Sequence, residues 1–212
     1  TGIIANAPRR LFAAGLGDAL STWFEARACK NSGARTMARG NVSNTGLMMA
    51  RLCYDLLMEK GRDALAAVER HEVTPALEDV VEATIYLSGL GFENGGLAAA
   101  HAVNDGFAQE PQAHGMYHGE KVAFGTLVQL VLEKAPQEEL EQVLAFLRDT
   151  GLPLTLAQLG VKEIVPETLK KVAEAAVVPT QSTKNLRADI TAQEVYDAIL
   201  EADRIGRDYL AR

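Results

Sequence analysis

Two histidines lie among small residues in the segment from Gly95 to Gly125, GGLAAAHAVNDGFAQEPQAHGMYHGEKVAFG. His101 and His118 are 17 positions apart, and Pro111 and Gly115 between them predict an intervening loop. Two separate helices could therefore direct their imidazoles at one point. Histidines in such a setting indicate a metal site.

A carboxylate is the expected third ligand, and the best candidate is Asp18 in GDALSTWFEA. We expect Asp18 to open a helix after a glycine-rich turn, where Asp is also a preferred N-cap that needs no metal. One Asp and two His fit a catalytic zinc site, which uses three protein ligands and leaves one position open. Iron(II) also accepts this ligand set.

Each candidate also has a simpler interpretation. His101 alone would more often be a hydrogen-bonded core histidine, and His118 could serve only as a helix cap, although Tyr117 and Glu120 are possible partners in an outer shell. We expect His114 in a loop, facing solvent or the mouth of a substrate site. His71 is expected on the surface without a role.

The segments GDALSTWFEA, GGLAAAHAVNDGF and MYHGEKVAFG, in this order, resemble the glycerol dehydrogenase family of the iron-containing alcohol dehydrogenase superfamily. The resemblance extends over essentially the whole chain. It implies a multi-helix domain like the C-terminal domain of the dehydroquinate synthase-like and iron-containing alcohol dehydrogenases. It also implies that Asp18, His101 and His118 are catalytic zinc ligands.

The same resemblance implies an NAD-dependent oxidation of glycerol or a related vicinal diol to a ketone such as dihydroxyacetone. His101, His118 and Phe92 are the expected substrate-binding residues, although Phe92 and Phe107 could equally be core aromatics. Iron-type relatives carry a histidine four residues after the aspartate, where this chain has Thr22, and this favours zinc over iron. Related enzymes form homo-oligomers, often octamers.

The family also has an N-terminal NAD-binding domain, to which nothing in this sequence corresponds. We interpret residues 1–15 as a remnant of the interdomain connection and residues 1–212 as one helical metal- and substrate-binding domain, inactive alone. A natural half protein is the alternative. Two other functions remain open: a non-catalytic helical zinc-binding or interaction module, and a zinc hydrolase with Glu120 as the base.

Composition excludes several classes of protein. The formal net charge of −7 and the pI near 5.2 argue against nucleic-acid and anionic-membrane partners, which are themselves negative. Cys29 and Cys53 form no C-x-x-C motif and are expected to be buried thiols. Because no apolar run reaches membrane-spanning length and no signal-peptide pattern opens the sequence, we predict a cytoplasmic protein.

Apolar residues recur with helical spacing along almost the entire sequence, and no pair of alternating strands is joined by a hairpin turn. The predicted class is therefore mainly α. Beside the His101 helix, the predicted helices cover about 18–30, 44–61, 75–87, 122–132, 136–150, 166–176 and a last segment after 191. The segment 177–189 is predicted to be a loop.

If the chain normally packs against a nucleotide-binding domain, it should expose apolar surface that this domain would cover. We therefore expect the isolated chain to self-associate. Light scattering checks this expectation, and a monodisperse monomer would contradict it.

Overall fold

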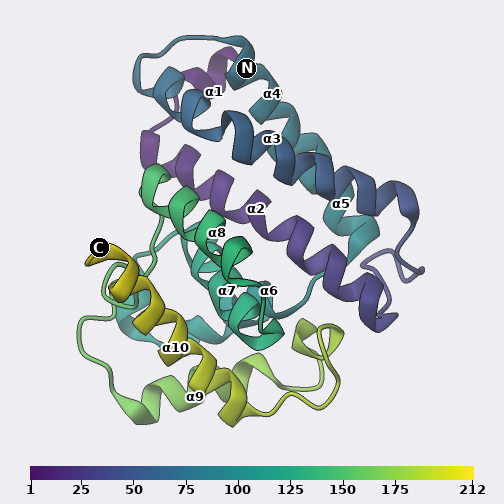
Figure 1. Ribbon diagram of the computed structural model, residues 1–212, viewed down its shortest axis with the longest axis vertical. Coiled ribbons are helices and arrows are strands. Elements are labelled where there is room, and N and C mark those ends of the chain that lie inside the picture. Colours follow the sequence, from purple (N-terminus) through teal and green to yellow (C-terminus); the bar gives the residue numbers. More distant parts are fainter.

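The computed structural model describes residues 1–212, and the chain consists of helices and connecting segments without a β-strand (Figure 1). The predicted mainly α class is confirmed. No helix combines the length and apolar character needed to cross a bilayer. The α-helices are α1 (Gly2–Ala5), α2 (Arg9–Ser32), α3 (Asn44–Glu69), α4 (Pro75–Val81), α5 (Ser88–Gly95), α6 (Ala99–Gly106), α7 (His118–Glu133), α8 (Gln137–Thr150), α9 (Pro166–Ala176) and α10 (Ala192–Leu210). A π-helical segment, η1 (Glu82–Leu87), joins α4 to α5, and the short 3₁₀ segments are η2 (Phe107–Gln109), η3 (Pro111–Ala113) and η4 (Ser182–Asn185).

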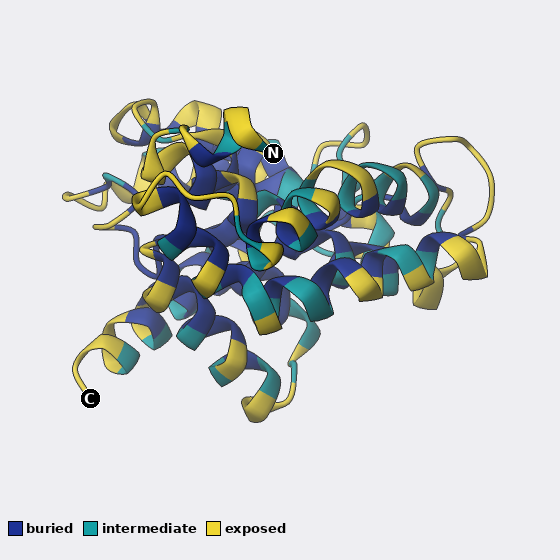
Figure 2. Ribbon diagram, turned by 90° about the horizontal axis from the view of Figure 1, so that it is seen from above, coloured by how far each residue is buried: buried dark blue, intermediate teal, exposed yellow.

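Helix α2 crosses the middle of the molecule and lies between two groups of helices (Figure 1). Helices α3, α4 and α5 lie on one side, and α6 to α10 lie on the other. Because α2 packs against α3 and α5 as well as α7, its opposite faces are both buried. A core of 45 buried apolar residues extends through both groups, as the distribution of buried segments in Figure 2 illustrates.

Several helix ends follow the local sequence signals. The side chain of Thr74 accepts a hydrogen bond from the N–H of Leu77, as expected of an N-cap followed by proline. Thr191 and Glu194 form the predicted capping box at the start of α10. Gly151 ends α8 in the left-handed region, with φ of 76°.

Other glycines do not end helices, and here the sequence predictions were wrong. Asp18 does not open a helix after a turn at Gly15 and Gly17, because α2 already begins at Arg9. Helix α3 continues past Gly61 to Glu69, and the helical path from Pro75 continues through Gly89 and Gly91 to Gly95.

Close helix packing explains Gly61 and Gly91. A Cβ atom on Gly61 would lie 2.9 Å from the ring of Phe146, and one on Gly91 would lie 3.0 Å from the side-chain methyl carbon of Thr22. Both distances are shorter than van der Waals contact. Glycine therefore occupies these positions because a neighbouring helix needs the space, and the local turn signal is overridden by packing.

Residues 9–15 and 177–189 contain helix that the sequence did not predict. Residues 9–15, which we assigned to the interdomain connection, form the first part of α2. The predicted loop 177–189 contains the short helix η4 but is otherwise irregular. Large apolar side chains remain exposed, among them Ile3, Met48 and Ile85.

The contact between α2 and α7 generates a testable prediction. A Cβ on Gly119 would lie 1.8 Å from the carbonyl oxygen of Ala14, so Gly119→Ala must push the two helices apart. We expect it to lower the free energy of unfolding by about 1–3 kcal/mol or more, as overpacking does. Equilibrium denaturation with urea measures the change.

Gly15→Ala is the matched control, because Gly15 lies on α2 and a Cβ added there would have no neighbouring atom within 4 Å. Replacing this exposed helical glycine should stabilise the protein by roughly 0.5–1 kcal/mol. Equal effects of the two substitutions would show that the α2–α7 approach does not constrain the fold.

Candidate metal centre

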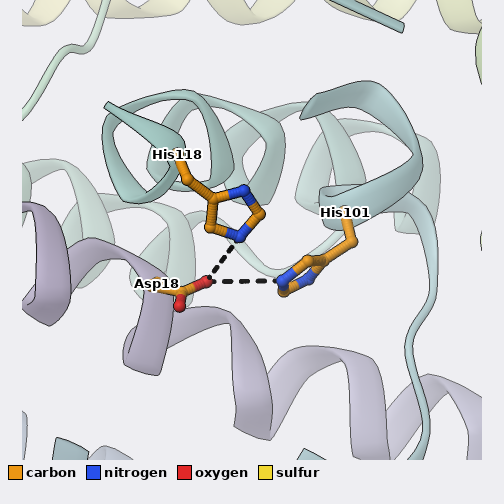
Figure 3. Close-up of side chains that lie close together, drawn as sticks. All are labelled: Asp18, His101 and His118. Atoms are coloured by element: carbon orange, nitrogen blue, oxygen red, sulfur yellow. Dashed lines mark ion pairs between the residues drawn. The ribbon is translucent and has the colours of Figure 1, made fainter. Parts of the chain in front are cut away.

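Asp18, His101 and His118 come together at one point of the structure (Figure 3). Asp18 lies in the middle of α2, His101 in the first turn of α6, and His118 is the first residue of α7. One ligand atom from each residue lies within 4.8 Å of the others. The structure therefore brings together all three of the residues that the sequence nominated as metal ligands.

Small residues let the three helices approach closely enough for this meeting. A Cβ on Gly17 of α2 would lie 2.6 Å from the carbonyl oxygen of Gly119 in α7. A Cβ on Gly125 of α7 would lie 2.3 Å from the carbonyl oxygen of Ala100 in α6. Glycine at these positions sets the short spacing from which the ligand side chains extend.

The two distances from Asp18 to the histidine nitrogens fit a tetrahedral cation. Oδ1 of Asp18 lies 3.3 Å from Nε2 of His101 and 3.3 Å from Nε2 of His118. Ligands bound at 2.0–2.1 Å with tetrahedral angles lie about 3.3 Å apart. Neither contact has hydrogen-bond geometry, and Oδ1 is a buried oxygen without a hydrogen-bond partner. Such an orphaned acceptor between two imidazole nitrogens suits a metal ion.

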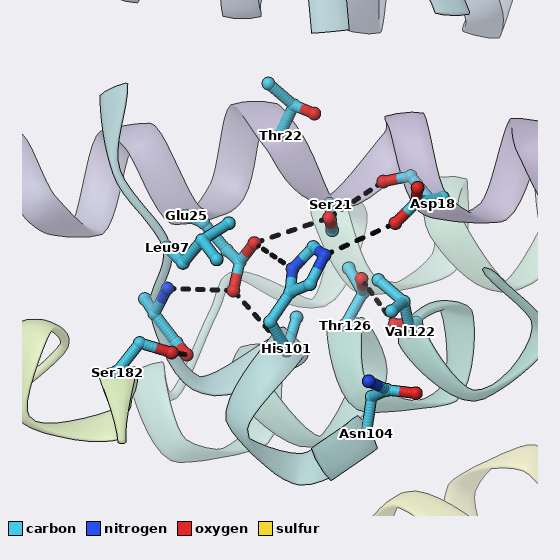
Figure 4. A network of polar contacts seen from close by, with 12 residues as sticks. Asp18, Ser21, Thr22, Glu25, Leu97, His101, Asn104, Val122, Thr126 and Ser182 are labelled. Carbon is cyan, nitrogen blue, oxygen red and sulfur yellow. Dashed lines mark hydrogen bonds and ion pairs between the residues drawn. The ribbon is translucent and has the colours of Figure 1, made fainter. Parts of the chain in front are cut away.

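The side chain of Glu25 lies behind His101 and is fully buried (Figure 4). Its Oε2 lies 2.6 Å from Nδ1 of His101, and its Oε1 accepts hydrogen bonds from the backbone N–H groups of Ala98 and His101. Sequence reasoning missed this residue. Its signal was a glutamate seven positions, about two helical turns, after Asp18 and within an apolar segment.

The carboxylates and imidazoles change one another's pKa values. Burial lowers the pKa of His101, but the carboxylates of Glu25 and Asp18 outweigh burial and raise this pKa above its ordinary value. Burial raises the pKa of Asp18, but attraction to His101 and His118 holds it well below its ordinary value. Because protons and metal ions compete for the same imidazole nitrogens, a bound cation would replace the proton on Nε2.

The cluster is accessible on one side. The side chain of His118 is 54% exposed and that of Asp18 is 43% exposed, whereas that of His101 is 19% exposed. Asp18 also borders a largely apolar cleft of about 270 Å³ between α2 and η1, lined on opposite sides by Leu11 and Ile85. A small molecule can therefore approach the cluster from solvent.

Comparison with known proteins shows that the sequence is similar to glycerol dehydrogenases. The sequence is 57% identical over 210 residues to a glycerol dehydrogenase from Escherichia coli O6:H1, a match that covers 99% of this chain. The chain is homologous to glycerol dehydrogenase. It spans 57% of the length of that relative. No protein-family model matches the chain.

Solved structures of glycerol dehydrogenases share the fold. The crystal structure of the Schizosaccharomyces pombe enzyme matches with a TM-score of 0.95 at 40% identity, covering 98% of this chain and 54% of that one. A probable glycerol dehydrogenase from Sinorhizobium meliloti 1021 matches with a TM-score of 0.93 at 44% identity, covering 98% of this chain and 58% of that one. The resemblance to the iron-containing alcohol dehydrogenase superfamily that the sequence motifs indicated is thus confirmed.

In this glycerol dehydrogenase homologue, Thr22 faces away from the three ligands (Figure 4). Its hydroxyl lies 2.9 Å from that of Ser88, and its methyl group faces Gly91. The position four residues after Asp18 thus contributes to packing between α2 and α5.

Tyr117 and Glu120 do not support His118 as the sequence suggested. Glu120 accepts a hydrogen bond from the backbone N–H of Tyr117 and pairs with Arg10 through both carboxylate oxygens. Its carboxylate therefore caps α7 and binds α2. The Tyr117 ring lies against the same Arg10 guanidinium.

The remaining histidines lie apart from the cluster. His114 follows η3, and its Nε2 lies 3.0 Å from the carbonyl oxygen of Ala108. His71 is exposed, as predicted. Phe107 is a core residue that packs edge-on against Phe124. Phe92 is partly buried in α5, and its proposed contact with substrate stays a prediction.

Two histidine variants test directly whether the cluster binds metal. In metal-free protein, Zn²⁺ at about 100 times its Kd should stabilise the folded state by about 2.7 kcal/mol. For a chain of this length the melting temperature should rise by roughly 5–10 °C. We expect His118→Ala to lose most of this rise and His114→Ala to retain it. Differential scanning calorimetry measures both, and a full rise in His118→Ala would place metal binding elsewhere.

Proposed function

We propose that this chain is the metal- and substrate-binding part of an NAD-dependent glycerol dehydrogenase that oxidises glycerol to dihydroxyacetone. Asp18, His101 and His118 would hold Zn²⁺, with iron the less favoured metal. The observation that carries the proposal is the convergence of these three ligand atoms in a homologue of glycerol dehydrogenase. Glycerol or a related vicinal diol is the proposed substrate.

Zinc, when bound, supplies a Lewis acid that lowers the pKa of an alcohol hydroxyl and so favours loss of its proton. The chain's own residues prepare the site for this chemistry. Asp18 brings negative charge, and the neutral imidazoles of His101 and His118 would each offer Nε2. Because His118 is exposed, a small polyol can approach the site. Two neighbouring hydroxyls of one diol can approach one cation together, which is an entropic advantage over a simple alcohol.

The hydride acceptor in this proposal is NAD. We assign the nucleotide site to parts of the complete protein outside this chain, and we expect the chain alone to be inactive. The same proposal includes a cytoplasmic location and a homo-oligomeric assembly of the complete enzyme, with the octamer often formed by related enzymes as the expected form.

The hydrolase alternative loses support from the structure. A general base needs a free carboxylate near the metal-binding atoms, but both oxygens of Glu120 are engaged by Arg10 and the carboxylate is 6% exposed. The non-catalytic zinc-binding or interaction module remains as the competing outcome of the experiment.

The first measurement is bound metal by elemental analysis, on the purified chain and on the double variant Asp18→Ala/His101→Ala. We expect about one zinc per chain, lost in the variant, because three protein ligands define a zinc site. The second measurement is NAD-dependent glycerol oxidation after the chain is joined to the nucleotide-binding domain of a glycerol dehydrogenase.

Activity in the joined protein, lost in the double variant, is the expected result. Zinc binding without activity would favour the non-catalytic module. Hydrolysis of ester substrates by the unjoined chain would restore the hydrolase interpretation. Absence of bound zinc from wild-type protein after incubation with the metal would overturn the proposed site.

A further inference from the structure

The buried carboxylate of Glu25 has no part in the chemistry proposed above. Glu25 lies on α2, and its side chain is completely buried. Three nitrogen atoms surround it: Nδ1 of His101 at 2.6 Å, and the backbone nitrogens of Ala98 at 2.8 Å and of His101 at 3.0 Å. Ser21 adds only a long contact of 3.4 Å.

We propose that Glu25 is a positioning residue that fixes the tautomer and orientation of His101, so that Nε2 is the nitrogen available to the metal. A carboxylate only accepts hydrogen bonds, so Nδ1 of the neutral ring carries the proton and donates it to Oε2. The lone pair is then on Nε2, which lies 3.3 Å from Oδ1 of Asp18. This inference rests on the metal site of the proposed function.

Glu25 fixes the backbone of His101 as well as its ring. Oε1 accepts from Ala98 and His101 at the N-terminal end of α6, where the N–H groups have no partner within the helix. The Glu25 carboxylate therefore contacts both the backbone nitrogen and the imidazole ring of His101. Because Glu25 and Asp18 belong to the same helix, α2 sets the distance between Asp18 and the imidazole that it faces (Figure 4).

Charge supports the same role. Asp18 contributes one negative charge to a dication, and Glu25 contributes a second through the hydrogen-bonded imidazole. Carboxylates that accept from the outer nitrogen of a metal-binding histidine increase its basicity, and their loss typically weakens metal binding by about 10–100-fold.

Glu25→Gln separates positioning from packing, because the two side chains have nearly the same shape. The amide oxygen can still accept from the two N–H groups of α6, but the NH₂ group then faces Nδ1. This NH₂ is a donor, so it selects the tautomer with the proton on Nε2. The reverse amide orientation places the NH₂ against two backbone donors. The first arrangement opposes metal binding through Nε2, and the second leaves the backbone N–H groups of Ala98 and His101 without an acceptor.

The experiment measures zinc affinity by chelator competition and melting temperature without metal, for wild type, Glu25→Gln and Glu110→Gln. Glu110 is a buried glutamate that accepts from the N–H of Gln112, away from the cluster, and serves as the matched control. We expect about 10–100-fold weaker zinc binding in Glu25→Gln alone. The visible spectrum of the Co²⁺ form should also change in this variant and not in the control.

Wild-type affinity in a folded Glu25→Gln variant would overturn the positioning role while leaving the metal site intact. A wild-type chain without zinc affinity would overturn the metal site itself, and the inference with it. The two failures are therefore distinguishable.

A second measurement needs no variant and decides the question if Glu25→Gln does not fold. In wild-type protein with nitrogen-labelled histidine and bound cadmium, scalar coupling identifies which nitrogen of each ring binds the metal. We expect coupling to Nε2 of His101 and a slowly exchanging proton on Nδ1. Metal bound to Nδ1 would overturn the proposal, because the His101 ring would then have no N–H to donate to Glu25.

Discussion

The contact of α2 with α7 is the constraint on which the site depends. Backbone atoms meet where Gly119 faces the carbonyl oxygen of Ala14, and Gly17 lies beside Gly119 in turn. Each glycine in a helix interior costs about 0.5–1 kcal/mol relative to alanine. Here that cost is offset by packing, and the result is a helix spacing short enough for Asp18 and His118 to face each other.

Glycines that allow close helix packing also explain which parts of the fold could be predicted. Helical periodicity, caps such as Thr74 and the capping box of α10 depend on residues close in sequence, and these predictions were confirmed. The ends assigned to Gly61 and Gly91 were wrong because a glycine that makes room for another helix resembles, in sequence, one that ends its own helix. Only the position of the neighbouring helix distinguishes the two cases.

The sequence indicated the three candidate metal ligands but not the buried residue behind them. His101 and His118 stood out because imidazoles among small residues are uncommon, and the family motif selected Asp18 among many acidic residues. Glu25 carried no comparable signal, since glutamate is frequent in helices and its partners Ala98 and His101 are more than seventy positions away. Tertiary structure alone shows that its carboxylate is buried against the N-terminal end of α6.

The buried carboxylate of Glu25 also affects the electrostatics of the site. Both histidines lie at helix N-terminal ends, where the helix dipole places partial positive charge and disfavours a cation. At α7 the carboxylate of Glu120 offsets this charge, but its own charge is neutralised by Arg10. At α6 the carboxylate of Glu25 has no arginine or lysine partner and accepts from three nitrogens and, at 3.4 Å, from the hydroxyl of Ser21. The negative charge that favours a divalent cation beside His101 therefore comes from α2, through Asp18 and Glu25 together.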